Sequence, residues 1–281
     1  MNKYDVHGRV VLITGSTGGL GTELAIALHD AGAKLALLDL DLDAANAQAR
    51  LLGSEEVAKG WAVDVRSLES VTSAIDAAAQ HFGGIDVVIA AAGIAKIGTV
   101  AEGSVDDFEA VIDINLLGAW RTLRAAAPYV VDRQGYLLAV SSMAAFVHPP
   151  LMGSYNASKA GIWAMCDAMR LELRPTGTAV GTLHPTFFKT PMVDAAMADP
   201  ATQAMAGDDR ANLFRLVPIE VVVAAVIDGI EKRSNQIIVP RNLKPAAALP
   251  GLMRAIISQF GSKDEAIVRA TEVLREAEQS R

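Results

Sequence analysis

The residues of this chain whose types and spacing could support proton transfer are Tyr155, Lys159 and Ser142. Tyr155 and Lys159 are four residues apart in a predicted helix, and Ser142 lies thirteen residues before Tyr155, at the expected end of a strand. One helical turn places the phenol and the ammonium on the same face. We therefore expect the positive charge of Lys159 to lower the pKa of Tyr155, so that this phenol can accept and donate a proton.

A glycine-rich turn near the start of the chain predicts a site for phosphate groups. It follows an apolar run over residues 9–14 and leads into a helical pattern that continues to about Ala31. Its glycines are Gly15, Gly18, Gly19 and Gly21. We expect the first to permit the turn, one of the middle pair to let the backbone approach a pyrophosphate, and the last to let the helix pack on the strand. The helix N-terminus would then face the anionic phosphates.

A second apolar run, over residues 34–39, ends in Asp39, twenty-four residues after Gly15. An acidic side chain at this place accepts hydrogen bonds from ribose hydroxyls and repels a 2′-phosphate. No Arg or Lys directly follows Asp39, and none lies within residues 16–20. We therefore expect NAD as the cofactor in preference to NADP. The alternative is that Asp39 is an ordinary turn residue.

Composition excludes several classes of function. With 281 residues, 51% of them hydrophobic, the chain can bury a full core. Its net charge of −7 argues against nucleic-acid binding. The single cysteine, Cys166, gives neither a disulfide framework nor a metal site, and no histidine pair has metal-ligand spacing. The first residues carry no signal or anchor pattern, and no apolar run could span a bilayer, so we expect a cytoplasmic protein without a metal.

Short apolar runs alternate with Ala-rich helical stretches over the first 240 residues. The predicted strands are 9–14, 34–39, 57–64, 85–90, 135–141, 178–184 and 236–240. This alternation predicts an α/β fold, in which a doubly wound parallel sheet of about seven strands has helices on both faces. Ligands of such sheets bind beyond the carboxyl ends of the strands, where the glycine turn, Asp39 and Ser142 all fall.

These motifs together resemble the short-chain dehydrogenase/reductase (SDR) family, over roughly residues 7–240. Because Gly18 and Gly19 are adjacent, the turn fits both Thr-Gly-x-x-x-Gly-x-Gly, the pattern of compact members, and Thr-Gly-x-x-Gly-x-x-Gly, that of longer epimerase-like members. The chain length and the spacing from Ser142 to Tyr155 favour the compact branch, as does the run Asp-Ile-Asn-Leu-Leu-Gly. The resemblance implies an NAD-dependent oxidoreductase that interconverts a secondary alcohol and a ketone.

The resemblance also implies how the chain is organised and which residues form the site. It implies a Rossmann-type domain over 1–240 with a substrate lid at about 186–215, followed by a C-terminal helical extension over 241–281. The catalytic set is Ser142, Tyr155, Lys159 and Asn115. Tyr155 would be the general acid/base, while Ser142 orients the substrate oxygen, although Ser141 competes for that role. Asn115 would hold a water that links the lysine to solvent. The cofactor-binding set is Gly15, Thr17, Gly18, Gly19, Leu20, Gly21, Asp39, Asp64, Val65, Ala91, Ala92, Gly93, Tyr155, Lys159, Pro185, Phe188 and Thr190.

The chain departs from the family pattern at two places. Ala90-Ala91-Ala92-Gly93 stands where the family has Asn-Asn-Ala-Gly, and Pro185-Thr186 stands where it has Pro-Gly. We expect altered cofactor affinity at both places and no loss of chemistry. Two histidines near the site, His148 and His184, are interpreted as packed or solvent-facing residues.

Apolar side chains follow the sixth predicted strand, where the family builds its substrate lid. They are Phe187, Phe188, Met192, Val193, Met197, Met205, Leu213 and Phe214. They favour an apolar alcohol or ketone, although equally they could pack a lid helix on the core. Other hypotheses are an NAD-binding scaffold or redox sensor with little turnover, and an epimerase or dehydratase that uses bound NAD transiently.

The region beyond Pro240 differs from the acidic bulk of the chain. Residues 241–263 carry basic but no acidic residues, with apolar residues at helical spacing. This segment could pack on its own domain, lie on an anionic membrane surface, contact a second subunit or close over the substrate cleft. The helix expected from about Ser262 alternates its charges and is predicted to be solvated. Relatives form dimers or tetramers through the helices that carry Asn115 and Tyr155, so a homodimer or homotetramer is expected.

Overall fold

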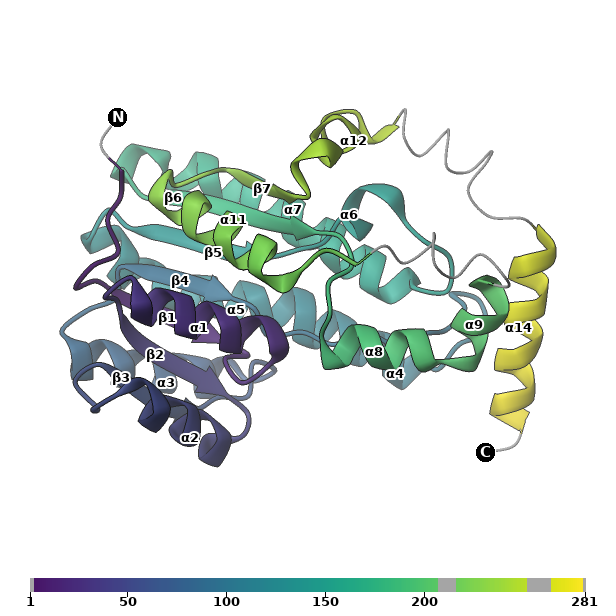
Figure 1. Cartoon of the computed structure of the whole chain (residues 1–281), viewed down its shortest axis with the longest axis horizontal. Helices are drawn as coiled ribbons and strands as arrows, with labels where there is room; N and C mark the ends of the chain where they lie inside the picture. The colour runs from purple at the N-terminus through teal and green to yellow at the C-terminus, as the bar shows by residue number, and fades with distance from the viewer. Residues whose placement is uncertain (1–2, 207–215, 252–263, 280–281) are drawn as a thin grey trace.

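A computed structural model describes residues 3–206, 216–251 and 264–279 and shows a seven-stranded, fully parallel sheet in the order β3-β2-β1-β4-β5-β6-β7 (Figure 1). The strands are β1 Val10–Thr14, β2 Lys34–Asp39, β3 Ala58–Ala62, β4 Val87–Ala90, β5 Tyr136–Val140, β6 Ala179–Pro185 and β7 Gln236–Val239. Each predicted strand is confirmed, with ends that differ by at most two residues. The strands β2, β1, β4 and β5, which are neighbours in this sheet order, are buried along most of their length, as expected for a sheet covered on both faces.

The helices that cover the sheet alternate with its strands along the chain. They are α1 Gly19–Asp30, α2 Leu42–Leu52, α3 Leu68–Phe82, α4 Val105–Val111, the π-helical turn η1 Ile112–Leu117, α5 Gly118–Asp132, α6 Ala144–Val147, α7 Gly153–Leu173, the 3₁₀ turn η2 Arg174–Thr176, α8 Pro191–Ala198, α9 Pro200–Ala206, α11 Ile219–Glu231, the 3₁₀ turn η4 Arg241–Leu243, α12 Lys244–Ala248 and α14 Asp264–Gln279. The lid region predicted at 186–215 thus contains α8 and α9 in its described part, and residues 207–215 lie outside the described residues.

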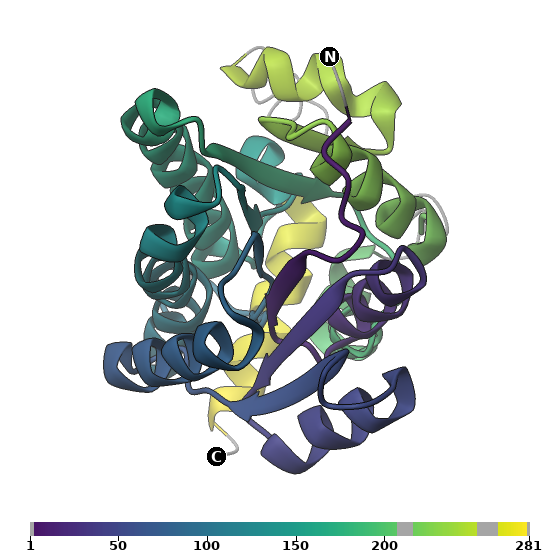
Figure 2. The ribbon, with the colours of Figure 1, turned by 90° about the vertical axis from the view of Figure 1, so that its left-hand side faces the viewer.

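Two hydrophobic cores, one on each face of the sheet, make this a three-layer fold. One core joins the sheet to α3, α5 and α7. The other joins it to α1 and α11. Figure 2 shows the two helical layers on either side of the twisted sheet. The predicted doubly wound α/β fold is therefore confirmed.

The strand order reverses between β1 and β4, and this reversal creates the site. β1 pairs with β2 on one side and with β4 on the other, so the loops that leave the carboxyl ends of β1 and β4 diverge to opposite faces of the sheet. A crevice opens where such loops separate, and ligands of doubly wound sheets bind there. The glycine turn follows β1 and Gly93 follows β4, so both lie at this crevice.

The C-terminal region packs against the domain in its described part. Ala246 and Ala247 of α12 lie in a small core with Met143 and Phe146. The helix α14 was expected to be solvated, and this holds for its charged face, where most side chains are exposed. It is wrong for the opposite face, which packs along α9 and buries Ala270 completely. The basic segment 241–263 was predicted to pack on its own domain or to contact a membrane, a partner or the cleft, and its residues 252–263 lie outside the described residues. No helix in the described ranges has the length and apolar character that crossing a bilayer requires.

Candidate active site

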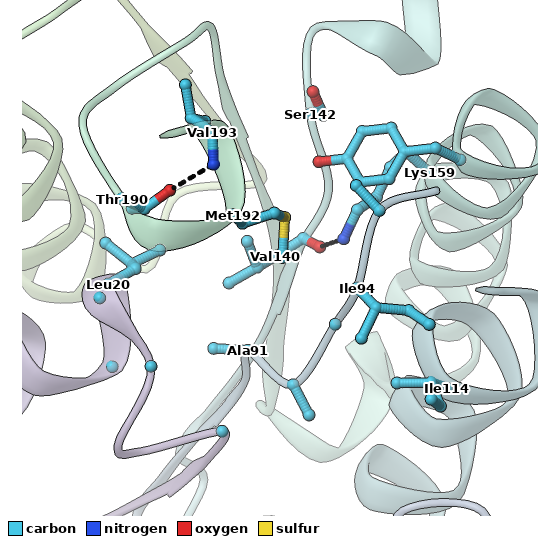
Figure 3. Close-up of a pocket in the computed structure, with 18 of the residues that line it drawn as sticks. Leu20, Ala91, Ile94, Ile114, Val140, Ser142, Lys159, Thr190, Met192 and Val193 are labelled. Carbon is cyan, nitrogen blue, oxygen red and sulfur yellow. Dashed lines mark hydrogen bonds between the residues drawn. The ribbon is translucent and has the colours of Figure 1, made fainter. Parts of the chain in front are cut away.

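A single cavity of about 660 Å³ lies at the carboxyl ends of the strands and joins the glycine turn to the predicted catalytic residues (Figure 3). Ser142, Tyr155, Lys159 and every member of the predicted cofactor-binding set line it. Asn115 does not line the cavity and lies behind Ile94, which does. The structure thus brings together residues from positions 15 to 190 of the chain.

Tyr155, Ser142 and Lys159 meet on one wall of this cavity. The Ser142 hydroxyl forms a hydrogen bond with the Tyr155 phenol. The Lys159 ammonium lies 5.3 Å from the centroid of the Tyr155 ring. Its Nζ donates a hydrogen bond of 2.8 Å to the carbonyl oxygen of Val140, at the end of β5 (Figure 3). The helix α7 supplies the phenol and the ammonium one turn apart. The last residue of β5 supplies the carbonyl that holds the ammonium, and the segment directly after β5 supplies the hydroxyl that contacts the phenol.

The protonation of this pair differs from our expectation. Burial raises the pKa of Tyr155 above its ordinary value, and the hydrogen bond from Ser142 opposes this only in part. The expected lowering of the Tyr155 pKa by Lys159 is therefore wrong for the protein without a ligand. Burial also lowers the pKa of Lys159 to about 8. Both shifts have the same cause, because a low-dielectric surrounding disfavours the charged form of each group.

Ser141 and Ser142 occupy distinct places, although both were candidates for the same role. The Ser141 side chain is buried, and its hydroxyl donates a 2.8 Å hydrogen bond to the backbone carbonyl of Lys159. The Ser142 hydroxyl accepts from the amide of Ala144 at 3.1 Å and is the one that reaches Tyr155. Ser141 therefore ties α7 to the end of β5. The Ser142 hydroxyl, which also lies 3.5 Å from the carbonyl oxygen of Pro185, is the one placed beside the Tyr155 phenol at the cavity.

Asn115 braces the loop that follows β4. It lies in η1, where the helix widens to a π-turn, a feature often found at functional sites. Its amide accepts a 2.8 Å hydrogen bond from the Ile94 amide and donates one of 2.9 Å to the Ile94 carbonyl. A further bond of 3.2 Å reaches the hydroxyl of Ser158, next to Lys159. Asn115 thus fixes one side of the cavity wall beside the lysine.

The glycine turn is suited to an anion. Gly15 has a φ of +69°, and a Cβ there would lie 2.7 Å from the Cα of Ala92, so only glycine fits. A Cβ at Gly21 would overlap the carbonyl oxygen of Gly15. Gly18 caps α1 without a side chain, and the first turn of this helix has no acidic residue. The helix therefore presents its unpaired amides and its positive dipole end to the cavity.

Four other helices satisfy some of these amides with a side chain. The helices α2, α3, α4 and α8 begin at Asp41, Ser67, Ser104 and Thr190, whose side chains accept from a backbone amide in the first turn. The helices α7 and α11 also begin without a side-chain cap. The feature that suits α1 to an anion is therefore the place of its open N-terminus, at the cavity beside the glycine turn.

The far end of the cavity carries the charges. Asp39 accepts hydrogen bonds from the amides of Thr17 at 2.9 Å and Leu40 at 2.8 Å, which tie the glycine turn to the end of β2. Arg66 also lines this end, and it was not considered in the sequence prediction. It donates from two nitrogens to the carboxylate of Asp64, at 2.7 to 3.1 Å. This pairing lowers the pKa of Asp64 and occupies the arginine.

The two departures from the family pattern are accommodated by the backbone. Ala91 donates its amide to the carbonyl of Thr14 at 3.2 Å, so the loop after β4 keeps a backbone link to β1 without an asparagine side chain. Thr186 donates its amide to the carbonyl of Val239 at 2.9 Å. It is not among the described residues with a left-handed φ, so its side chain causes no strain there.

The opposite end of the cavity is apolar. Side chains anticipated from the sequence are Phe187, Phe188, Met192 and Val193, and the structure adds Ile94, Met143, Val147, Pro149, Met152 and Ala196. Met143 directly follows Ser142, and Met152 lies three residues before Tyr155. This closeness in sequence to the predicted catalytic residues is the signal that could have indicated them. Met197 does not line the cavity, Met205 packs in a separate core, and Leu213 and Phe214 lie outside the described residues.

The remaining titratable residues near the site are structural. His184 is buried under Ser142, where burial lowers its pKa to about 4, and its ring packs 4.7 Å from that of Phe146. His148 bonds to the carbonyl of Ala145 and does not line the cavity. Burial raises the pKa of Cys166 to about 12, so this thiol is inert. No cluster of potential metal ligands occurs within the described ranges.

Comparisons with known proteins agree with this layout. A family model described as short chain dehydrogenase matches residues 9–201. The chain is 32% identical over 225 residues to the D-threitol dehydrogenase of Mycolicibacterium smegmatis, with 79% of this chain and 86% of that protein covered. It is 34% identical over 206 residues to the (-)-trans-carveol dehydrogenase of Rhodococcus erythropolis, with 67% and 74% covered. A solved short chain dehydrogenase/reductase from Burkholderia phymatum, in complex with NAD, superposes with a TM-score of 0.77 at 25% identity and covers 93% of this chain and 98% of its own.

Proposed function

This chain belongs to the short chain dehydrogenase family, and from that premise we propose that it is an NAD-dependent oxidoreductase that interconverts an apolar secondary alcohol and its ketone. One observation carries the proposal. Ser142, Tyr155 and Lys159 meet on the wall of a cavity whose other end is an uncapped helix N-terminus.

The residues at the glycine turn fit a dinucleotide. The open amides of α1 would hold its pyrophosphate, and the Asp39 carboxylate at the end of β2 would accept from the adenosine ribose. When bound, the nicotinamide group would accept a hydride from the alcohol or deliver one to the ketone. Asp39 favours NAD because its charge would repel a 2′-phosphate, and the nearby Arg66 is already paired with Asp64.

The proton is handled by the chain's own side chains. Ser142 would donate a hydrogen bond to the substrate oxygen and hold it beside the Tyr155 phenol. Tyr155, protonated because burial raises its pKa, is ready to give its proton to a ketone oxygen, and in the reverse direction its phenolate would take the proton of an alcohol. Lys159, positively charged below a pH of about 8, would stabilise this phenolate, since its Nζ lies 5.3 Å from the centroid of the Tyr155 ring.

The lining of the substrate end supports an apolar compound. The charged side chains Asp39, Asp64 and Arg66 line the other end of the cavity. The bound cofactor would lie between them and the substrate end. A polyol would leave its extra hydroxyl groups without partners among Met143, Met152 and the side chains of α8, and an unpaired buried hydroxyl is costly. The relative named for carveol, an alicyclic alcohol, is therefore a better guide to the substrate than the relative named for threitol.

A coupled cofactor and substrate screen tests this proposal. Purified protein is given NAD⁺ or NADP⁺ together with matched secondary alcohols, either apolar and cyclic, such as carveol, or polyols, such as threitol. We expect NADH to accumulate with the apolar alcohols and much less with the polyols or with NADP⁺. Absence of turnover with every alcohol, although NAD⁺ binds, would instead support a scaffold or sensor, and a cofactor that copurifies and never leaves would support an epimerase.

A proposal on self-association accompanies this function. Leu117 and Trp120, on η1 and α5, and Leu171, on α7, are large apolar side chains that remain exposed in the isolated chain. Both α5 and α7 cover the same face of the sheet. A homodimer or homotetramer built on these helices would bury such side chains, and light scattering of Trp120→Glu against the unmodified protein tests it.

A further inference from the structure

The C-terminal helix α14 has one face that the proposed chemistry does not explain. Its sequence is rich in charge, yet Ala270 is 0% exposed, while Val268, two residues earlier, is 54% exposed. The helix lies alongside α9, next to α8 at one end of the molecule (Figure 1), and α8 supplies side chains to the apolar end of the cavity. A fully buried residue on a charged helix indicates a specific contact.

That contact is a small hydrophobic core separate from those on the two faces of the sheet. Leu151, Ala201 and Ala270 are its buried members, and the side chains packed around them are Ile97, Ala204, Met205, Val273 and Leu274. These residues come from four places that are distant in sequence. They are the loop after β4, the segment before α7, the helix α9, and α14 itself.

Through Leu151, α14 supports one wall of the substrate half. Pro149 and Met152, on either side of Leu151, line the cavity. Leu151 has a φ of +63°, in a left-handed conformation that is unfavourable for a leucine and persists only where packing maintains it. Its carbonyl accepts a 2.9 Å hydrogen bond from the Gly98 amide, and its side chain is covered by α14.

Through α9, the same helix supports the opposite wall. The helix α9 follows α8 directly, and Met192, Val193 and Ala196 of α8 line the cavity. Ala201 and Met205 of α9 face Ala270 in the shared core. The start of α8 is fixed separately, since Thr190 caps it and packs near Gly19. The two ends of this wall are thus held by the cofactor turn and by α14.

A charged pair fixes the position of α14 along these walls. Arg275 donates from Nε and from Nη2 to the two carboxylate oxygens of Glu102, at 2.7 and 2.9 Å. Glu102 belongs to the loop that also contains Gly98. Such a bidentate pair has a defined geometry, so it selects one register of the helix.

From these contacts we infer that α14 is a clamp that joins the 149–152 wall to the α8–α9 wall and so sets the width of the substrate half of the cavity. It is a positioning element and does not touch the reacting atoms. The inference rests on the proposed function only in assigning this half of the cavity to the substrate. The side chains of α14 thereby become determinants of substrate size, although none of them lines the cavity.

Hydrogen exchange in the NAD-loaded, full-length protein tests the clamp without any substrate. Ala270→Glu places a carboxylate in the shared core. The matched control is Val268→Glu, which introduces the same residue, itself a good helix former, on the exposed face of α14. We expect Ala270→Glu to speed amide exchange in α8, in α9 and at Leu151 and Met152, with exchange at the glycine turn unchanged; Pro149 and Pro150 have no amide hydrogen. Val268→Glu should leave all of these segments as they are. Equal exchange of the two walls in both variants would overturn the inference.

A charge swap gives a second test that does not disturb the core. Glu102→Arg and Arg275→Glu alone should each raise the KM for carveol, and the double variant should restore it, with the Kd for NAD⁺ constant throughout. For Ala270→Glu we expect a KM increase of about tenfold, within the usual range for coupled sites. An unchanged KM in Ala270→Glu would refute the clamp. If no alcohol is turned over, the proposed function fails, and the exchange result still decides on the clamp.

Discussion

Lys159 gives the sharpest quantitative prediction, because the structure makes it a buried cation whose cost to stability depends on pH. Its side chain is 5% exposed, and burial lowers its pKa from 10.5 to about 8. Between these two values the unfolded chain binds a proton that the folded protein does not, so stability rises with pH in this window. Lys159→Met removes this titration and replaces the side chain by an apolar one of similar length.

The magnitude follows from the two pKa values. Between pH 7 and pH 10, the free energy of unfolding of the unmodified protein should rise by about 2.5 kcal/mol relative to that of Lys159→Met. The difference between the two proteins is the quantity measured, because other titrating groups largely cancel in it. Urea unfolding at several pH values, without cofactor, gives this difference.

The control is Lys34→Met, which removes an exposed lysine at the start of β2. We expect its stability difference to stay flat over the same pH range. A flat difference for Lys159→Met, within about 0.5 kcal/mol, would refute the claim that burial controls the charge of Lys159. Lys159→Met should also abolish alcohol oxidation. Near pH 7, where the charged lysine lowers the stability of the unmodified protein most, this substitution would therefore raise stability and remove activity.

Three further substitutions test the rest of the site. Asp39→Asn removes a charge but keeps one acceptor for the Thr17 amide, and it should narrow the ratio of NAD to NADP affinity by about tenfold or more, measured by fluorescence titration. Gly21→Ala drives a methyl group against the Gly15 carbonyl, so it should destabilise the protein by about 1–3 kcal/mol and weaken NAD⁺ binding, measured by thermal unfolding with and without NAD⁺. Ser142→Ala should lower kcat by about 10²-fold at unchanged Kd for NAD⁺, and an equal loss in both would contradict its assigned role.

The layout of the sheet could be predicted from the sequence because its signals are local. Most strands are short apolar runs, and the turn after β1 carries Gly15, which has a left-handed φ, and Gly21, where a Cβ would overlap the Gly15 carbonyl oxygen. Asp39 ends β2 in the structure as predicted. The family resemblance and the doubly wound fold are confirmed for the same reason.

The features that the sequence did not predict depend on contacts between distant segments. The raised pKa of Tyr155 results from burial, and the residues that bury it come from several elements across the fold. The charged pattern of α14 indicated a solvated helix, because a single alanine, Ala270, gives no sign of a partner such as Leu151. Arg66 and Asp64 are only two residues apart in sequence, so their pairing is local. Their place at the cavity is not local, because it follows from the position of β3 beside β2.

The most direct test of the proton-transfer account is the activity of Tyr155→Phe. This change removes one hydroxyl, which is hydrogen-bonded to Ser142, and keeps the aromatic ring beside Lys159. The matched control, Tyr129→Phe, removes a hydroxyl that bonds to Asp76 outside the cavity. With NAD⁺ and the best alcohol of the screen, we predict no NADH from Tyr155→Phe, undiminished NAD⁺ binding, and normal turnover by Tyr129→Phe. NADH formation by Tyr155→Phe at the rate of the unmodified protein would contradict the account.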